Sequence, residues 1–93
     1  MNVKLGPNIF EKLKKLDVRI RNRFKEKILI FQINPNEPLL KNHQLQDPYK
    51  GLKSIDITND YRAVYEEIKM GDEEIAYFII LGTHNELYIS KNN

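Results

Sequence analysis

The stretch from Ile75 to Leu81 constrains the fold more than any other, because it is apolar at positions facing both sides of a strand. Strands that are buried on both faces read as continuous apolar runs, whereas half-exposed strands alternate. We therefore expect this stretch to lie centrally in a sheet. Gly82 interrupts the run, and His84 and Tyr88 follow it. Both side chains are expected just past the end of a buried strand, where they can reach a cleft.

The first third of the chain has the spacing of two amphipathic helices. Pro7 suits the first turn of one helix, and Asp17 is a good N-cap for the next. The first helix carries apolar residues at helical spacing: Ile9, Phe10, Leu13 and Leu16. The second carries one apolar stripe: Ile20, Phe24, Ile28 and Phe31. Asn34-Pro35-Asn36 ends the pattern. Because Asp17 directly follows Leu16, the two helices are joined tightly, and a helical hairpin is expected.

Alternating segments after a polar connector, 39–51, predict strands. Residues 52–58 send Ile55 and Ile57 to one face, residues 61–68 form a second strand, and a charged turn at 69–73 leads into the third. Residues 1–5 suit either a short edge strand or a lead-in, and the tail from Glu86 is expected to add a short strand. The order predicts one α+β domain over residues 1–93, with the N-terminal helical hairpin packed on one face of a small antiparallel β-sheet. The expected core is Leu13, Ile20, Phe24, Ile28, Ile55 and Ile57. The other face is expected to display Asp56, Lys53 or Arg62, with His84 at its rim.

The composition excludes several classes of protein. The chain has no cysteine and only two histidines, so neither a disulfide framework nor a zinc site is expected, and no other metal or small-molecule cofactor is predicted. No signal peptide is recognised, and the apolar runs fall short of the roughly 20 residues that a membrane span needs. We therefore expect a cytoplasmic protein with no membrane contact.

The charge is divided unevenly along the chain. Residues 1–53 carry 12 Lys or Arg against 5 Asp or Glu, a net +7, whereas residues 54–93 carry 3 against 8, a net −5. Arg19, Arg23 and Lys27 form a basic stripe at steps of four along the second helix. A basic first half suits a polyanion or an acidic protein partner, and it is equally compatible with a solvated helix face.

Four segments follow one another with a specific order and spacing: HQL at 43–45, KGLKSIDI at 50–57, DYRAVY at 60–65 and GTHNELY at 82–88. Together they resemble the RelE/ParE toxin superfamily, and within it the YafQ-like messenger-RNA interferases of bacterial type II toxin–antitoxin modules. The resemblance implies a ribosome-dependent endoribonuclease that cuts messenger RNA in the decoding site, where it also contacts 16S rRNA. It also implies an acidic antitoxin that wraps and silences the toxin.

The resemblance assigns roles by position. The catalytic positions are His84, His43, Asp60, Arg62 and Tyr88, and Lys53 and Arg62 match residues that contact phosphate. Asp56 is a departure, because YafQ-like members can carry a second histidine there.

These residue types suit metal-independent cleavage of RNA. Attack of a 2′-hydroxyl on the adjacent phosphorus needs a base, an acid and cations around the phosphate oxygens, and two imidazoles can fill the first two roles. Asp60 can orient a histidine or act as a base, and Tyr61 or Tyr88 can stack on a base. The residues expected to bind RNA are Lys50, Lys53, Tyr61, Arg19, Arg23 and Lys27.

Structural explanations stand beside the catalytic ones. Arg62 can pair with Asp56 across the sheet, Tyr88 can be a core aromatic, and Asp60 can be a turn residue. Two other functions also remain open. One is a ParE-like toxin that binds DNA gyrase without cutting RNA, although that branch generally lacks the paired histidines. The other is a small interaction module without toxicity.

Overall fold

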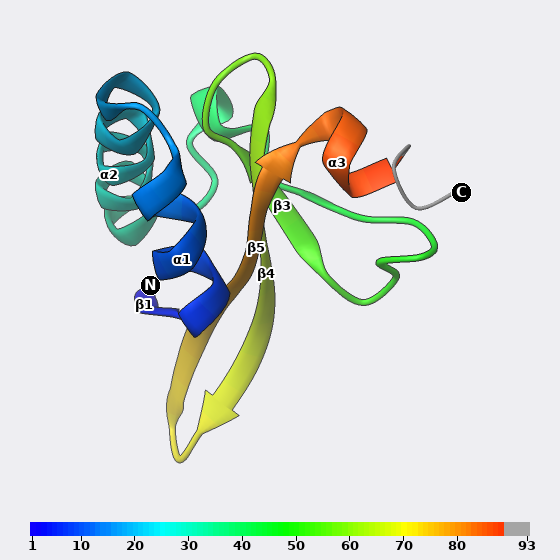
Figure 1. Ribbon diagram of the computed structural model, residues 1–93. Helices are drawn as coiled ribbons and strands as arrows, with labels where there is room; N and C mark the ends of the chain where they lie inside the picture. The colour runs from blue at the N-terminus through cyan, green and yellow to red at the C-terminus, as the bar shows by residue number, and fades with distance from the viewer. Residues whose placement is uncertain (89–93) are drawn as a thin grey trace.

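The computed structural model describes residues 1–88 of the chain. Within that range the elements are, in chain order, β1 (Asn2–Leu5), α1 (Pro7–Lys15), α2 (Val18–Ile33), the 3-10 turn η1 (Pro38–Leu40), β2 (His43–Gln44), β3 (Lys53–Asp56), β4 (Tyr61–Met70), β5 (Glu73–Thr83) and α3 (His84–Tyr88). Helices α1 and α2 cover one face of the sheet, and α3 lies on the other (Figure 1). The predicted helical hairpin on a sheet is confirmed.

Both helices of the hairpin begin where the sequence predicts. Pro7 occupies the first turn of α1, and the side chain of Asp17 caps α2 by accepting a hydrogen bond of 3.1 Å from the backbone N–H of Ile20. Helix α2 ends at Ile33, directly before the predicted Asn34-Pro35-Asn36 stop. The two helices are separated only by Leu16 and Asp17, which keeps them side by side on the sheet.

The sheet is mixed rather than wholly antiparallel, which corrects the prediction. Its strand order is β1-β5-β4-β3-β2, and β1 pairs with β5 in parallel, with Asn2 opposite Ile75. The other pairings are antiparallel. Strand β5 therefore has a partner on each side, as its apolar run predicts. The option of a short edge strand at residues 1–5 is also confirmed.

A β-bulge determines which residues of β5 face the main core. Val64 pairs with Ile80, but the next residue, Tyr65, pairs with Phe78, so Ile79 is the extra residue in β5. A bulge shifts the in–out alternation of the strand that contains it. Phe78 and Leu81 consequently both enter the main core, although they are three positions apart.

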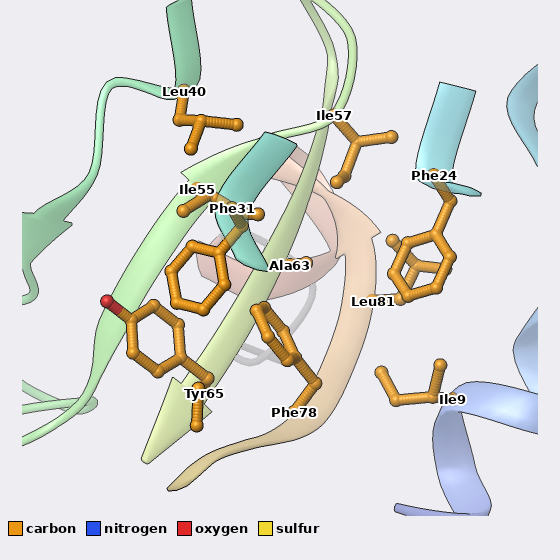
Figure 2. Close-up of a cluster of buried hydrophobic side chains, with 11 residues drawn as sticks. Ile9, Phe24, Phe31, Leu40, Ile55, Ile57, Ala63, Tyr65, Phe78 and Leu81 are labelled. Atoms are coloured by element: carbon orange, nitrogen blue, oxygen red, sulfur yellow. The ribbon is translucent and has the colours of Figure 1, made fainter. Parts of the chain in front are cut away.

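The main core lies between the helical hairpin and the sheet (Figure 2). At its centre Phe31 of α2 makes edge contacts with the rings of Tyr65 and Phe78, with centroids 5.1 and 5.4 Å apart. Ile55 is also buried there. Of the other expected core residues, Phe24 and Ile57 are buried, Leu13 and Ile28 pack against the cluster, and Ile20 is half-buried.

A second cluster covers the opposite face of the sheet. Leu45 of the connector, Val64 of β4 and Leu87 of α3 are buried together there. The hydroxyl of Tyr49 donates a 2.7 Å hydrogen bond to the carbonyl of Leu87, which ties the connector to α3. The short strand expected from Glu86 is wrong over residues 86–88, which belong to α3, and the rest of that expected strand lies outside the described residues.

Candidate active site

A cavity of about 400 Å³ lies on the sheet face that α1 and α2 leave uncovered. Its lining comes from the connector, β3, β4 and α3, and consists of Lys41, His43, Leu45, Ser54, Asp56, Arg62, His84, Leu87 and Tyr88. We call it the histidine cavity. Both histidines of the chain line it, although they are far apart in sequence, and Arg62 and Tyr88 join them. The alternation of β3 explains the position of Asp56, because Ile55 and Ile57 face the main core.

Arg62 is fixed in this cavity by its neighbours on β3 and in the turn. It lies directly opposite Asp56 in the antiparallel register, and its Nε lies 3.1 Å from Oδ1 of that carboxylate. Its Nη1 donates to the carbonyl oxygens of Thr58 and Asn59 at 3.1 and 3.0 Å. The cross-strand pairing expected for the free protein is confirmed. Because the guanidinium is held on two sides, it presents its charge to the cavity in one orientation.

His43 lies on β2, where the pairing of that strand with β3 places it opposite Ser54. Its Nδ1 lies 2.7 Å from the carbonyl oxygen of Lys41. A carbonyl can only accept, so Nδ1 carries the proton in this contact and Nε2 of the neutral ring keeps its lone pair. Lys41 itself has a positive φ of 49°, which is uncommon for a residue with a side chain. That backbone conformation turns the chain into β2 and directs the carbonyl of Lys41 at His43.

His84 is the first residue of α3, a helix of five residues. The helix begins with a reciprocal capping box: the backbone N–H of Thr83 donates to Oε1 of Glu86 at 2.8 Å, and the N–H of Glu86 donates to Oγ1 of Thr83 at 3.1 Å. The N–H of His84 donates to the carbonyl of Asp60 at 3.1 Å. These three hydrogen bonds hold the backbone on either side of His84, so the exposed imidazole projects from a backbone segment of fixed position.

Three aromatic rings line up beside the cavity. The His84 ring lies 4.8 Å from the ring of Tyr88, which in turn makes an edge contact with Tyr49 at 5.5 Å. Burial and the nearby Tyr49 raise the pKa of Tyr88 above its ordinary value, although Arg62 opposes that shift. The phenol of Tyr88 is therefore protonated at neutral pH and can donate a hydrogen bond.

A second cavity of about 350 Å³ adjoins the first and shares Lys41 and Asp56 with it. Arg23 and Lys27 of α2 line this basic cavity. The ammonium of Lys27 donates to the carbonyl of Ile57 at 3.2 Å, which fixes it at the end of β3. Two of the three residues of the predicted basic stripe are thus placed beside the histidine cavity.

A third cavity, of about 360 Å³, lies on the other side of Leu45, which it shares with the histidine cavity. Lys50 and Lys53 line it, and the ammonium of Lys53 pairs with Glu67 at 3.2 Å. Lys53 is therefore outside the lining of the histidine cavity, whereas Arg62 is part of it.

The remaining predicted site residues do not meet in the histidine cavity. Tyr61 packs against the main core on the opposite sheet face, so of the two tyrosines offered for base stacking, Tyr88 is the one beside the histidines. The exposed Asp60 approaches His84 through its backbone carbonyl. Arg19 is largely exposed at the start of α2, 3.9 Å from Asp17.

Sequence reasoning missed Lys41 and Tyr49. Lys41 gave no sequence signal, because a left-handed backbone at a lysine cannot be read from composition. Tyr49 lies in the connector beside a proline and a glycine, and only the folded connector brings it to Tyr88.

Two further observations concern metal binding and membrane spans in the described part of the chain. Within residues 1–88, no group of three or more His, Cys, Asp or Glu side chains is arranged to hold a metal ion. None of the helices in the same range has the length and apolar character required to cross a bilayer.

No protein-family model matches the chain, and no curated protein matches it in sequence. Solved structures do match it. The YoeB/ParE toxin from Agrobacterium tumefaciens has a TM-score of 0.68 and 23% identity, covering 90% of this chain and 99% of that one. YafQ from E. coli strain BL21(DE3) has a TM-score of 0.67 and 19% identity, covering 94% and 97%.

A third match is to the E. coli DinJ–YafQ toxin–antitoxin complex, with a TM-score of 0.57 and 21% identity over 94% of this chain and 96% of the other. At these identities the likeness concerns the fold. All three matches span nearly the whole of both chains. The resemblance read from the four sequence segments is confirmed at this level: the chain has the fold of the RelE/ParE-like toxins, as seen in YoeB/ParE and YafQ.

Proposed function

We propose that this chain is the toxin of a bacterial type II toxin–antitoxin module and that it cleaves messenger RNA on the ribosome by metal-independent acid–base catalysis. The observation that carries the proposal is the convergence of His43, His84 and Arg62 on one cavity. These are the only two histidines of the chain. One comes from the connector and the other from α3, and no local sequence pattern brings these two segments together.

The reaction has a defined balance of bonds and protons. A base takes the proton from a ribose 2′-hydroxyl, and the 2′-oxygen forms a bond to the adjacent phosphorus. The bond from phosphorus to the 5′-oxygen breaks, and an acid protonates that oxygen. The products are a 2′,3′-cyclic phosphate and a 5′-hydroxyl, and no oxidant or metal is consumed.

The two histidines take different roles in this scheme. In neutral His43 the proton on Nδ1 is directed at the carbonyl of Lys41, which leaves Nε2 as the acceptor that a general base requires. His84 is then the acid that protonates the leaving 5′-oxygen. The ring of Tyr88, 4.8 Å from that of His84, limits the directions in which the imidazole can turn.

Cations around the cavity stabilise the negative charge that develops on the phosphate. Arg62 is already oriented, so a phosphate oxygen can replace Asp56 as its partner without reorganisation of the guanidinium. Lys41 supplies a second charge at the same wall. The rings of Tyr88 and Tyr49, which are in edge contact with each other, offer a surface on which an unpaired base can stack.

The two neighbouring cavities extend this surface for RNA. Arg23 and Lys27 lie on one side of the histidine cavity, and Lys50 and Lys53 on the other. A single strand that passes through all three cavities meets a cation at each end and the histidines in the middle. Contacts of this kind contribute affinity without sequence preference.

An acidic antitoxin is the protein partner of this proposal. Helix α2 carries large apolar side chains that are exposed, Val18, Leu29 and Ile33, within the half of the chain that has a net charge of +7. Exposed apolar residues among cations suit a partner that is acidic and amphipathic. The E. coli protein with the same fold was solved as a toxin–antitoxin complex.

The test is cleavage of a short messenger RNA on programmed ribosomes, with the ends mapped chemically. We expect the wild type to produce 2′,3′-cyclic phosphate and 5′-hydroxyl ends, and His84→Ala to produce none while melting at the same temperature. Asn85→Ala is the matched control, because Asn85 is the exposed neighbour of His84 on the same helix. Cleavage by a folded His84→Ala protein would overturn the catalytic role of His84. Inhibition of DNA gyrase without cleavage of RNA would favour the ParE-like alternative.

A further inference from the structure

Glu86 connects three parts of the molecule through one carboxylate. Oε1 accepts the hydrogen bond from the backbone N–H of Thr83, and Oε2 lies 2.7 Å from the ammonium of Lys12 on α1, 74 residues away in the sequence. Glu86 is therefore at once the third residue of α3, a member of its capping box and the ion-pair partner of the helical hairpin. His84 lies between Thr83 and Glu86, so every one of these contacts acts on the backbone that carries the imidazole.

Gly82 makes this arrangement possible. A Cβ atom at position 82 would lie 3.0 Å from Oε1 of Glu86 and 3.5 Å from its Cβ. A side chain there would require the carboxylate, the group that accepts from the N–H of Thr83, to shift by a few tenths of an ångström. Gly82, which interrupts the apolar run of β5, thus leaves room for the side chain of Glu86 to turn back towards Thr83.

Helix α3 is too short to hold its own geometry. Within residues 1–88 it comprises five residues, whereas isolated helices shorter than about 12–15 residues are marginal in water because nucleation is unfavourable. Its direction therefore depends on the contacts at its ends. Burial of Leu87 and the bond from Tyr49 anchor the C-terminal end, and Glu86 anchors the end that carries His84.

We propose that Glu86, held by Lys12, is a positioning residue for His84: it fixes the first turn of α3 so that the imidazole lies against Tyr88 and faces the cavity. The role in cleavage rests on the proposed nuclease function, but the positioning itself does not. Glu86 is not part of the cavity lining, so in this proposal it acts through His84 and not on the reacting phosphate.

The ion pair between Lys12 and Glu86 acts locally. Its effect on the position of His84 can therefore be measured separately from its effect on the stability of the whole fold. The side chains of Lys12 and Glu86 are 28% and 48% exposed, and ion pairs this open to solvent contribute little to global stability. A displacement of about 1 Å at a catalytic group can nevertheless cost about 100-fold in rate. We therefore expect variants of this pair to lose cleavage rate at nearly unchanged melting temperature and unchanged ribosome affinity.

The test combines kinetics with a readout that does not depend on nuclease activity. The His84 ring protons feel the ring current of Tyr88, so their NMR shifts report whether the two rings remain in contact, with their centroids 4.8 Å apart. We expect Glu86→Ala to lose this shift and to cut programmed messenger RNA roughly 10- to 100-fold more slowly under single-turnover conditions. Lys12→Ala should show a smaller loss of both, and Lys12→Arg should restore them.

Lys14→Ala is the matched control, because it removes the same charge from α1 and breaks a surface ion pair with Glu11. It should change neither the His84 shift nor the rate. If Glu86→Ala fails to fold, Glu86→Gln decides, since its amide oxygen can still accept from Thr83 but no longer attracts Lys12 by charge. A folded variant of Glu86 with the wild-type His84 shift would overturn the proposal. A lost shift in a protein whose wild type cuts no RNA would support positioning and refute the nuclease function.

Discussion

Arg62 and Asp56 face each other directly across strands β4 and β3, with Nε of the guanidinium 3.1 Å from Oδ1 of the carboxylate. Their side chains are 22% and 15% exposed, so the pair is partly desolvated. A guanidinium in that environment needs an anion, and a phosphate entering the cavity would compete with Asp56 for the same donor.

Replacing Arg62 by lysine tests whether the guanidinium stabilises the phosphate during cleavage or serves only as the ion-pair partner of Asp56. The ammonium keeps the charge but loses the planar fork and the bonds from Nη1 to the carbonyls of Thr58 and Asn59. We expect a lower melting temperature and, per folded molecule, a loss of about 100-fold in single-turnover cleavage with little change in ribosome affinity. A rate that is unchanged once corrected for the folded fraction would make Arg62 a purely structural partner of Asp56.

His43→Ala should lower the cleavage rate by about 100-fold, which is within the range for one acid–base group. The fold should be retained, because His43 is exposed and its ring hydrogen-bonds to the backbone carbonyl of Lys41. Single-turnover kinetics on the ribosome measure the effect, with Asn85→Ala, an exposed residue outside the lining of all three cavities, as the control. Wild-type kinetics in His43→Ala would remove this histidine from the mechanism.

Glu86 predicts how stability responds to acid. The hydrogen bond from Lys12, followed by that from the backbone of Thr83, lowers the pKa of Glu86 below its ordinary value of 4.5. A carboxyl whose pKa is lower in the folded state stabilises the fold fully above its unfolded pKa and loses this contribution as the pH falls through the folded pKa. Because the pair is open to solvent, the stability difference between wild type and Glu86→Gln should be small; it should be present at neutral pH and should shrink below pH 4.5. Urea midpoints across this range measure it, and a difference independent of pH would contradict the assignment.

Tyr65 makes the opposite prediction for alkali. Its hydroxyl donates a 2.8 Å hydrogen bond to Oδ1 of Asn42, and burial raises the pKa of Tyr65 to about 12. The raised pKa means that its stabilising contribution is complete below the unfolded value of 10.0 and is lost as the pH rises towards 12. Tyr65→Phe should cost about 1 kcal/mol at neutral pH and should lessen the alkaline loss of stability. The half-buried Tyr77, changed to Phe, is the control; an equal effect there would refute the prediction.

The exposed apolar side chains of α2 predict where the proposed antitoxin binds. Ile33 is 86% exposed, and an acidic substituent there would repel an acidic partner as well as remove apolar contact. We expect Ile33→Glu to weaken the complex at least about 10-fold, and added salt to weaken the wild-type complex. Met70→Glu is the control, because Met70 is also exposed but lies at the tip of the β4–β5 hairpin. Equal affinity of the two variants, measured with the protein encoded beside this chain, would place the interface elsewhere.

Much of the architecture can be predicted because it depends on local pattern. The cap at Asp17, the stop at Asn34 and the alternation of Ile55 and Ile57 are each set by a few neighbouring residues. The pairing of His43 with His84 in one cavity could be proposed only through the family resemblance, since nothing local connects the two segments.

The features that sequence reasoning missed depend on long-range geometry. The left-handed backbone at Lys41 and the contact of Tyr49 with Tyr88 arise only when the connector is folded against α3. The face on which Tyr61 lies depends on the register between β3 and β4, which alternation alone does not determine. A shift of one residue in that register would have exchanged Tyr61 and Arg62 between the two faces.

The parallel pairing of β1 with β5 has a consequence for how the chain folds. Asn2 finds its partner only when Ile75 is available, so closing the sheet requires a contact between residues 73 positions apart in the sequence. Contacts of this kind are entropically costly and slow folding. A chain synthesised only as far as β4 lacks the partner of its first strand, the partner of Lys12 and the helix that carries His84. The candidate nuclease therefore cannot assemble its site until β5 and α3, residues 73–88, have been synthesised.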